Sequence, residues 1–336
     1  MSRRFDFASD NTAAAAPEAM DALIAANTGA ADSYGEDAWS ARAADLVRGL
    51  LDTDAEVRFV ASGTAANAVA VAALCRPFEA ILAHQYAHIG TNEAGAPTYF
   101  GQGLQIRSLP GASGLIDPSA LEAVLAQPDS AHTQAPAALS LTQATELGTI
   151  YTARHIADLT GPAKAKGLGV HMDGARLANA VAAGFDPKSI ARLSVDLLVV
   201  GGTKAGMTPT EALVIFDKAL ARRFDARLKM SGQLPSKSRF YSAPWIGMLE
   251  SGAFVDRARQ ANAMAQKLAA ASGLDLAHPV QTNGVFARMS IDHHARLTEA
   301  GWEVYAQDDG SVRFMCSWAT TEAAVEEVAS AIKALA

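Results

Sequence analysis

A single lysine follows an apolar segment near the middle of the chain. Residues 195–200 are mostly apolar, and Gly201, Gly202 and Thr203 lead directly to Lys204. The pattern predicts a buried strand that ends in a glycine turn and presents an amine at its mouth. A desolvated ammonium loses its proton more readily, so this lysine suits Schiff-base formation with a carbonyl compound. The alternative is an ordinary solvated loop charge.

Two charged residues emerge from a second predicted strand. Residues 168–172 form the strand, and Asp173 and Arg176 follow it. Because parallel strands end at the same edge of a sheet, we expect both side chains to lie near Lys204. The alternatives are a helix-capping role for Asp173 and a solvated surface position for Arg176.

A third segment is typical of a phosphate site. Ser62-Gly63-Thr64 joins a predicted strand to a helix of small residues over 65–74. Free backbone N–H groups and the helix dipole favour an anion there, and Thr64 adds a hydroxyl donor. It is not a Walker loop, because no Gly-Lys-Ser/Thr follows the first glycine.

Together these three segments predict pyridoxal 5′-phosphate as cofactor. Lys204 would form the Schiff base, Asp173 would keep the pyridine nitrogen protonated, and the helix start at Ser62–Thr64 would bind the phosphate.

Strands and helices alternate along most of the chain. The expected strands of the first part are 57–61, 80–83, 104–109, 137–141, 168–172, 196–200 and 212–216. The alternation predicts an α/β fold with a mostly parallel central sheet between helices, which binds ligands beyond the carboxyl ends of its strands.

The C-terminal part is expected to begin with one long helix over 244–271. Short strands at 285–289 and 312–316 and further helices follow it. We therefore divide the chain into a large cofactor-binding domain, 1–245, and a small C-terminal α/β domain, 246–336.

The composition of the chain indicates which kinds of molecule it can bind. The chain has 336 residues, 50% hydrophobic content and a net charge of −7, and its 28 Lys and Arg residues form no dense run. These features predict a large core and a small-molecule partner, and argue against nucleic acid or an anionic membrane. The sequence has two cysteines and shows neither a signal-peptide pattern nor a long apolar stretch, which predicts a cytoplasmic protein. The spacing of its histidines predicts no metal site.

Six blocks occur in the order found in a known family: Phe7-Ala-Ser-Asp10, Ser33-Tyr-Gly-Glu-Asp37, Ser62-Gly-Thr-Ala-Ala-Asn67, Ala87-His-Ile89 with Glu93-Ala-Gly95, His171-Met-Asp-Gly-Ala-Arg176 and Gly201-Gly-Thr-Lys204. They resemble the low-specificity L-threonine aldolases, which belong to the fold-type-I, β-eliminating lyase group of pyridoxal-phosphate enzymes. The resemblance covers essentially the full length, and the blocks around Asp173 and Lys204 are the most specific.

The resemblance implies roles for individual residues. His88 would stack on the cofactor ring, and Arg176 and Arg313 would hold the substrate carboxylate together with Ser9. Independently, Arg313 lies in an apolar predicted strand, where an unpaired guanidinium is costly. The full set of expected cofactor contacts is Ser62, Gly63, Thr64, His88, Asp173, Arg176, Thr203 and Lys204.

The resemblance leaves the catalytic base open. Many family members carry a second histidine in the loop that corresponds to 142–148, but here that loop contains none. The candidates are His88, Glu93, a water held by either of them, and Glu146.

Three further residues match family positions near a neighbouring site. The resemblance implies that Lys229 and Arg239 approach the cofactor phosphate, within one chain or across a subunit interface, and that Tyr34 approaches a neighbouring site, where it would contact the substrate. Surface exposure and loop packing are the alternatives. The resemblance also implies a homo-oligomer, either a dimer or a homotetramer.

The expected activity is reversible retro-aldol cleavage of L-threonine, L-allo-threonine and related β-hydroxy-α-amino acids to glycine and an aldehyde. The alternatives are β-elimination or transamination of another amino acid with the same cofactor, and a non-catalytic pyridoxal- or nucleotide-binding protein.

Overall fold

A seven-stranded sheet forms the centre of the molecule in a computed structural model that describes residues 3–335. Its strands are β1 (Glu56–Val60), β2 (Glu79–His84), β3 (Gln105–Leu109), β4 (Ala135–Thr142), β5 (Gly169–Gly174), β6 (Leu197–Gly201) and β7 (Glu211–Ile215). Their order is β1-β7-β6-β5-β4-β2-β3. Only β7 runs antiparallel to its neighbours, β1 and β6. The predicted mostly parallel α/β sheet is confirmed.

Both faces of this sheet are covered. On β6, Leu198 and Val200 belong to the apolar cluster on one face, and Leu197 and Val199 belong to the cluster on the other. The first cluster includes residues of α2 (Ala38–Leu51) and α7 (Ala153–Ala165), and the second includes residues of α3 (Gly63–Leu74) and α10 (Phe224–Met230). A strand buried on both faces reads as a continuous apolar run, which is why the sequence around 195–200 lacks alternation.

The remaining helices of this part are shorter or lie at its edges. They are α1 (Pro17–Ala26), α4 (His88–Thr91), α5 (Ala96–Phe100), α6 (Pro118–Leu125), α8 (Leu177–Ala182), α9 (Lys218–Ala221) and α11 (Arg239–Glu250).

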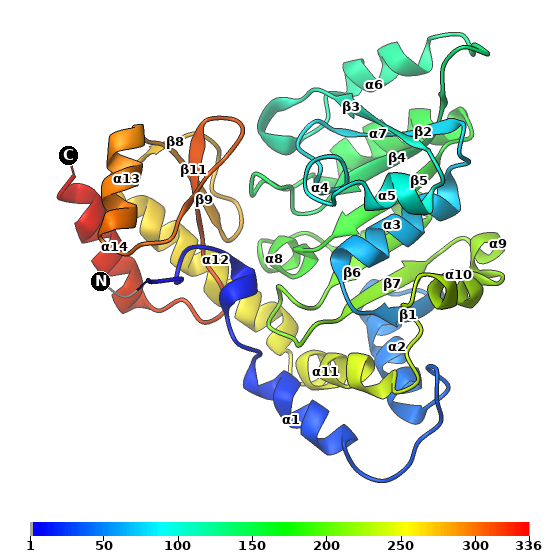
Figure 1. Cartoon of the computed structure of the whole chain (residues 1–336), viewed down its shortest axis with the longest axis horizontal. Coiled ribbons are helices and arrows are strands. Elements are labelled where there is room, and N and C mark those ends of the chain that lie inside the picture. The colour runs from blue at the N-terminus through cyan, green and yellow to red at the C-terminus, as the bar shows by residue number, and fades with distance from the viewer. Residues whose placement is uncertain (1–2, 336) are drawn as a thin grey trace.

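A smaller C-terminal unit lies beside the large sheet (Figure 1). Its antiparallel sheet has the order β10-β11-β9-β8, formed by β8 (Asp275–Leu276), β9 (Gly284–Arg288), β10 (Tyr305–Ala306) and β11 (Ser311–Met315). Its helices are α12 (Ala253–Ser272), α13 (Ile291–Glu299) and α14 (Glu322–Lys333).

The predicted single helix over 244–271 is wrong. The chain forms α11 and α12, which are separated at Ser251 and Gly252. Gly252 adopts a left-handed conformation with φ of 78°, which ends one helix direction and starts another. The domain boundary placed at residue 245 stays a prediction, and Trp245 lies inside α11.

The N-terminal segment packs against the C-terminal unit. Phe7 is fully buried in the core of that unit, and its carbonyl accepts a hydrogen bond of 2.8 Å from Met315 N. The ring centroids of Phe7 and Trp302 lie 5.8 Å apart. These contacts hold the next residues, Ser9 and Asp10, between the two parts of the molecule.

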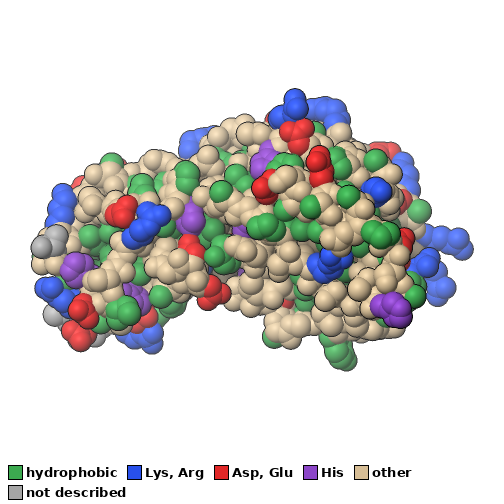
Figure 2. Space-filling view, turned by 90° about the horizontal axis from the view of Figure 1, so that it is seen from above, with side chains coloured by type: hydrophobic (Ala, Val, Ile, Leu, Met, Phe, Trp, Pro, Cys, Tyr) green, Lys and Arg blue, Asp and Glu red, His purple; other side chains and the backbone are tan. Residues whose placement is uncertain are grey.

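The surface carries charge of both signs. Figure 2 shows acidic and basic side chains scattered over both parts of the molecule on one face. None of the helices in residues 3–335 has the length and apolar character that a membrane crossing requires.

Candidate active site

Lys204 and Asp173 lie at the ends of adjacent strands, as the sequence predicts. Strands β5 and β6 are parallel neighbours, with Asp173 opposite Val199, and Lys204 follows β6 in a turn. Lys204 lines a cavity of about 410 Å³, together with His88, Arg176 and Arg313. Burial lowers the pKa of Lys204 and the Arg176 guanidinium lowers it further, against the opposing effects of Asp10 and Asp173. The shift favours the neutral, nucleophilic amine.

A chain of hydrogen bonds connects the floor of the cavity. Asn67 Nδ2 donates to Asp173 Oδ2 and to Glu93 Oε1, both at 2.8 Å. Glu93 Oε1 is also 2.9 Å from His88 Nδ1, and Asp173 Oδ1 accepts from Ala175 N at 2.9 Å. Asp173 and Glu93 are both buried, so each depends on these partners. The network fixes the position of His88 relative to Asp173.

Arg176 is held by a buried aspartate. Its Nε and Nη2 donate to the two carboxylate oxygens of Asp10 at 2.7 and 3.0 Å, a bidentate pair. Burial opposes the charge of Arg176, but Asp10 more than compensates and raises its pKa. Burial also opposes ionisation of Asp10, yet Arg176 and Lys204 lower the pKa of Asp10 to about 2. Asn283 Nδ2 donates to Asp10 as well, at 3.1 Å.

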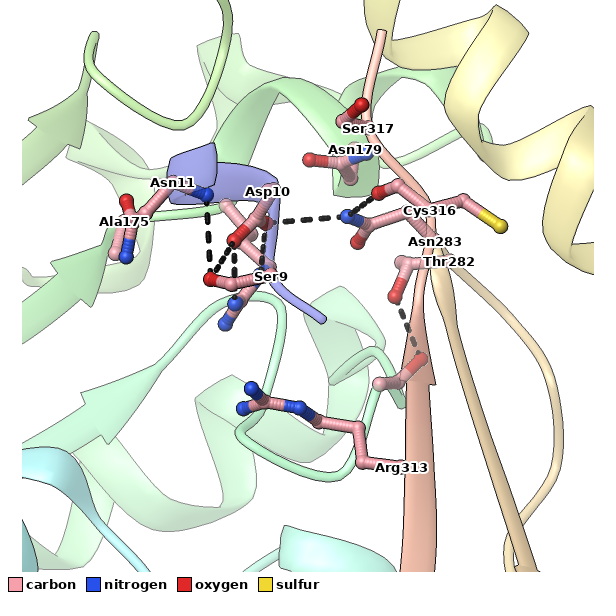
Figure 3. Close-up of polar contacts among 12 residues, drawn as sticks. Ser9, Asp10, Asn11, Ala175, Asn179, Thr282, Asn283, Arg313, Cys316 and Ser317 are labelled. Carbon is pink, nitrogen blue, oxygen red and sulfur yellow. Dashed lines mark hydrogen bonds and ion pairs between the residues drawn. The ribbon is translucent and has the colours of Figure 1, made fainter. Parts of the chain in front are cut away.

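Arg313 reaches the same cavity from the C-terminal unit. Figure 3 shows its side chain extending from β11 towards the larger part of the molecule. Its Nη2 donates to Ala8 O at 3.1 Å, while its buried Nε has no partner in the described chain. Burial, assisted by Arg176, lowers its pKa. A carboxylate would satisfy the free donor and offset this cost.

Ser9 lines the same cavity as Arg313. Its hydroxyl accepts a hydrogen bond of 3.2 Å from Asn11 N and so caps the short 3-10 helix η1 (Asp10–Thr12). The structure therefore brings the three predicted carboxylate-binding residues, Ser9, Arg176 and Arg313, to one cavity.

Unsatisfied polar atoms concentrate at this site. Among residues 3–335, eight buried side-chain polar atoms lack a hydrogen-bond partner, and six of them belong to residues that line the cavity or support its walls. The six residues are Asn67, Glu93, Glu146, His171, Asn283 and Arg313. Buried polar groups are normally paired, so this concentration indicates a site built for a polar ligand.

The comparisons with known proteins agree with this geometry. A family model described as Beta-eliminating lyase matches residues 6–292. The chain belongs to the β-eliminating lyase family. The resemblance to low-specificity L-threonine aldolases is thereby confirmed at the level of the family.

Individual relatives extend over nearly the whole of this lyase. It is 41% identical to a low specificity L-threonine aldolase of Pseudomonas sp. (strain NCIMB 10558), covering 98% of this chain and 97% of the relative. It is 28% identical to the low specificity L-threonine aldolase of Escherichia coli (strain K12), with coverages of 88% and 87%. A solved threonine aldolase structure from Leishmania major matches with a TM-score of 0.91 and 30% identity over 98% of both chains.

The expected phosphate side of the lyase site begins at α3. Ser62 caps this helix, and its hydroxyl accepts from Ala65 N at 3.3 Å, while Gly63 and Thr64 form the first turn. Asn67, one turn further along α3, donates to Asp173, so the helix start and the strand end are joined directly. Thr203 is partly occupied within its own turn, because its hydroxyl accepts from Thr210 N at 3.2 Å. Its predicted contact with the cofactor stays a prediction.

Tyr34, Lys229 and Arg239 lie away from the cavity wall of their own chain. The Lys229 ammonium is 4.2 Å from the centroid of the Tyr34 ring, and Tyr34 N donates to Ser236 O at 3.1 Å. Arg239 donates to Gly29 O at 3.2 Å. Lys229 in α10 and Arg239 at the start of α11 therefore contact the segment that contains Gly29 and Tyr34.

Several residues of the site were missed by sequence reasoning as functional groups. Asn67 and Asp10 belong to two of the blocks that resemble the known family. The position of Asn67, one helical turn after Ser62–Thr64, could have predicted that its side chain faces the site. Asn283 and the cavity-lining segment 305–309 carried no local signal, because their place depends on how the C-terminal unit packs.

Proposed function

We propose that this lyase cleaves L-threonine, L-allo-threonine and related β-hydroxy-α-amino acids to glycine and an aldehyde, with pyridoxal 5′-phosphate bound at Lys204. The observation that carries the proposal is the convergence of Lys204, Arg176 and Arg313 on one cavity above the Asp173 network. The names of the relatives with 41% and 28% identity support the substrate class.

The residues present fit the cofactor. When bound, pyridoxal phosphate supplies an aldehyde that condenses with amines and a conjugated ring that accepts the electron pair released at the substrate Cα. Lys204 offers the amine, Asp173 offers a carboxylate for the ring nitrogen, and the start of α3 at Ser62–Thr64 offers N–H groups for the phosphate. His88 offers a flat ring whose position Glu93 fixes.

The arginines orient the substrate. Arg313 has a free buried Nε, and Arg176 is anchored by Asp10 while it faces the cavity. Two guanidinium groups and Ser9 would fix the carboxylate of an amino acid, which leaves its Cβ hydroxyl to be directed towards the opposite wall. That orientation selects the Cα–Cβ bond for cleavage.

We further propose a homo-oligomer, a dimer or a tetramer, in which Tyr34, Lys229 and Arg239 contribute to a neighbouring subunit's site. Their mutual contacts, away from the cavity of their own chain, support this arrangement. We place the enzyme in the cytoplasm, since its two buried cysteines, Cys75 and Cys316, are free thiols, a usage typical of reducing compartments.

Replacing the central lysine tests the main proposal. Lys204→Ala is expected to abolish glycine release from L-threonine and the visible absorbance of the bound cofactor, because Lys204 is the one lysine among the described residues that line the cavity. Lys188→Ala, at an exposed lysine, is the matched control and should retain both. Retention of both properties by Lys204→Ala would overturn the proposal.

A second activity, β-elimination, is favoured by the description of the matching family. Incubation with L-threonine, L-phenylserine and L-cysteine separates the two. Glycine and an aldehyde indicate the aldolase, whereas pyruvate and ammonia indicate elimination.

A further inference from the structure

Glu146 is a cavity-lining residue with one paired and one unpaired carboxylate oxygen. It lies in the loop that follows β4, between Thr142 and the start of α7, and it lines the same cavity as Lys204 and His88. Its Oε1 accepts two hydrogen bonds of 2.9 Å, one from His88 N and one from Thr142 Oγ1. Its Oε2 is buried and has no partner in the described chain.

This arrangement leaves one carboxylate oxygen fixed and the other available. The two bonds to Oε1 remove the freedom of the side chain to rotate away, so Oε2 has a defined position. A buried carboxylate oxygen without a donor is unfavourable, and a hydroxyl from a ligand would satisfy it. Burial and the nearby Asp173 carboxylate raise the pKa of Glu146, which makes its ionised form a stronger proton acceptor than an exposed glutamate.

The other candidates for the base are less available. Glu93 also has a free buried oxygen, but its side chain is wholly enclosed and is not part of the cavity wall. His88 has Nδ1 committed to Glu93 at 2.9 Å, and the same contact fixes its ring. Glu146 lines the cavity, its Oε1 is held by two bonds, and its buried Oε2 has no partner in the described chain.

We propose that Glu146 is the general base that takes the proton from the β-hydroxyl of the substrate, an inference that rests on the proposed retro-aldol function. The O–H bond breaks as the proton moves to Glu146 Oε2, and its electron pair forms the second C–O bond of the departing aldehyde. The Cα–Cβ bond breaks at the same time, and its electron pair stays on Cα, next to the ring that pyridoxal phosphate would supply as an electron acceptor. A proton taken up from solvent is then added to Cα to complete glycine, and Glu146 gives the proton of the hydroxyl back to solvent once the aldehyde has left.

The test is a glutamine substitution that keeps the shape and the fixed oxygen. Glu146→Gln is expected to lower kcat for glycine release from L-threonine by about 100-fold or more, the range for loss of a general base. Exchange of the α-proton of glycine in heavy water needs no base at a β-hydroxyl, so it should stay within about 2-fold of wild type, a margin well below that loss. The visible absorbance of the bound cofactor should be unchanged. Glu146→Asp should recover part of the lost kcat.

A second readout needs no turnover. Infrared difference titration of wild type and of Glu146→Gln should differ by one carboxyl band that ionises above the usual glutamate range, whereas the buried Glu211, whose pKa is raised to about 7, should contribute a band to both. The pH profile of kcat/KM should lose its acidic limb in this variant, because the group that must be deprotonated is gone. Glu122→Gln, on the exposed face of α6, is the matched control and should behave as wild type.

The outcomes separate this inference from the function on which it rests. If the wild-type enzyme releases no glycine from L-threonine, the proposed function fails. If the wild type cleaves and Glu146→Gln cleaves within about 3-fold of it, a loss far below that of a base, Glu146 is not the base. Equal loss of cleavage and glycine exchange would also overturn the inference, because it would assign Glu146 to cofactor or substrate placement.

Discussion

The two sides of the cavity are built in different ways. The floor comes from adjacent elements of one sheet: Asp173 ends β5, Lys204 follows β6, and Asn67 on α3 joins Asp173 to Glu93. The opposite wall is assembled from the chain's two ends, with Ser9 and Asp10 from the N-terminal segment and Arg313 from β11.

The difference lies in what holds each side in place. The floor relies on a sheet core and on hydrogen bonds among buried groups, which fix the groups expected to contact the cofactor. The wall relies on the packing of Phe7 in the C-terminal unit and on the Asp10–Arg176 ion pair, which crosses from one part of the molecule to the other. Substitutions in the floor should therefore alter cofactor binding, and substitutions in the wall should alter substrate binding.

The largest expected effect is at Asn67. Asn67→Ala removes the donor to both Asp173 and Glu93 and leaves two buried carboxylates short of a partner. We expect a loss of about 2–4 kcal/mol in the free energy of unfolding and a markedly weaker affinity for pyridoxal phosphate. Urea titration and fluorescence titration with the cofactor measure the two effects. The exposed Gln127→Ala is the control, and a cofactor affinity unchanged in Asn67→Ala would contradict the proposed role of the network.

The next effect concerns the wall. Asp10→Asn breaks a buried ion pair and leaves Arg176 without its counter-charge, which should destabilise the protein by about 3 kcal/mol. Affinity for the substrate should fall while affinity for the cofactor is kept. The control is Asp45→Asn, which removes an exposed ion pair with Arg48 and should cost less than about 1 kcal/mol. If both variants lose a similar amount of stability, the Asp10–Arg176 pair contributes no more than an exposed ion pair does.

The pH dependence of stability tests the same ion pair. The pKa of Asp10 in the folded protein is about 2, below its usual value of 3.8. Its contribution to stability is therefore complete above the usual value and is lost as the pH falls towards 2. Between those limits, Asp10→Asn should show a smaller decline in melting temperature than wild type. An equal decline would mean that other carboxylates account for the acid sensitivity.

Local patterns in the sequence predict the floor well. Lys204 and Asp173 follow apolar runs, and parallel strands bring such ends together whatever the details of packing. The bridging role of Asn67 depends on the direction in which its side chain points. The block Ser62–Asn67 therefore predicts where Asn67 lies in the sequence of the site, but not which residues it contacts.

The wall depends on contacts that no local pattern carries. Asp10 and Arg176 are 166 residues apart, and the sequence around either residue does not predict that the two form an ion pair. The apolar pattern continues through Ser251 and Gly252, so periodicity predicts one helix where the left-handed conformation of Gly252 produces two. That break sets the direction of α12, which packs against β9 and α14 of the unit that supplies Arg313.

The smallest expected effect is at a contact between the cavity wall and the larger part of the molecule. His278 Nε2 is 2.5 Å from Asp309 Oδ2, and its Nδ1 is 3.1 Å from Ser113 Oγ in the larger part of the molecule. Ser113 O accepts a bond of 2.6 Å from Thr149 Oγ1, which belongs to the loop that carries Glu146. His278→Asn should cost about 1 kcal/mol, the net value of a typical hydrogen bond.

Because Asp309 lines the cavity, this variant should also raise KM for β-hydroxy amino acids by a few fold, while cofactor affinity stays at the wild-type value. The control is His132→Asn, in an exposed loop. We expect substitutions in the wall to change substrate binding and not cofactor binding. A change in cofactor affinity in His278→Asn, with KM unaltered, would contradict this expectation. The ratio of the two effects therefore measures how strongly the two sides of the cavity are coupled.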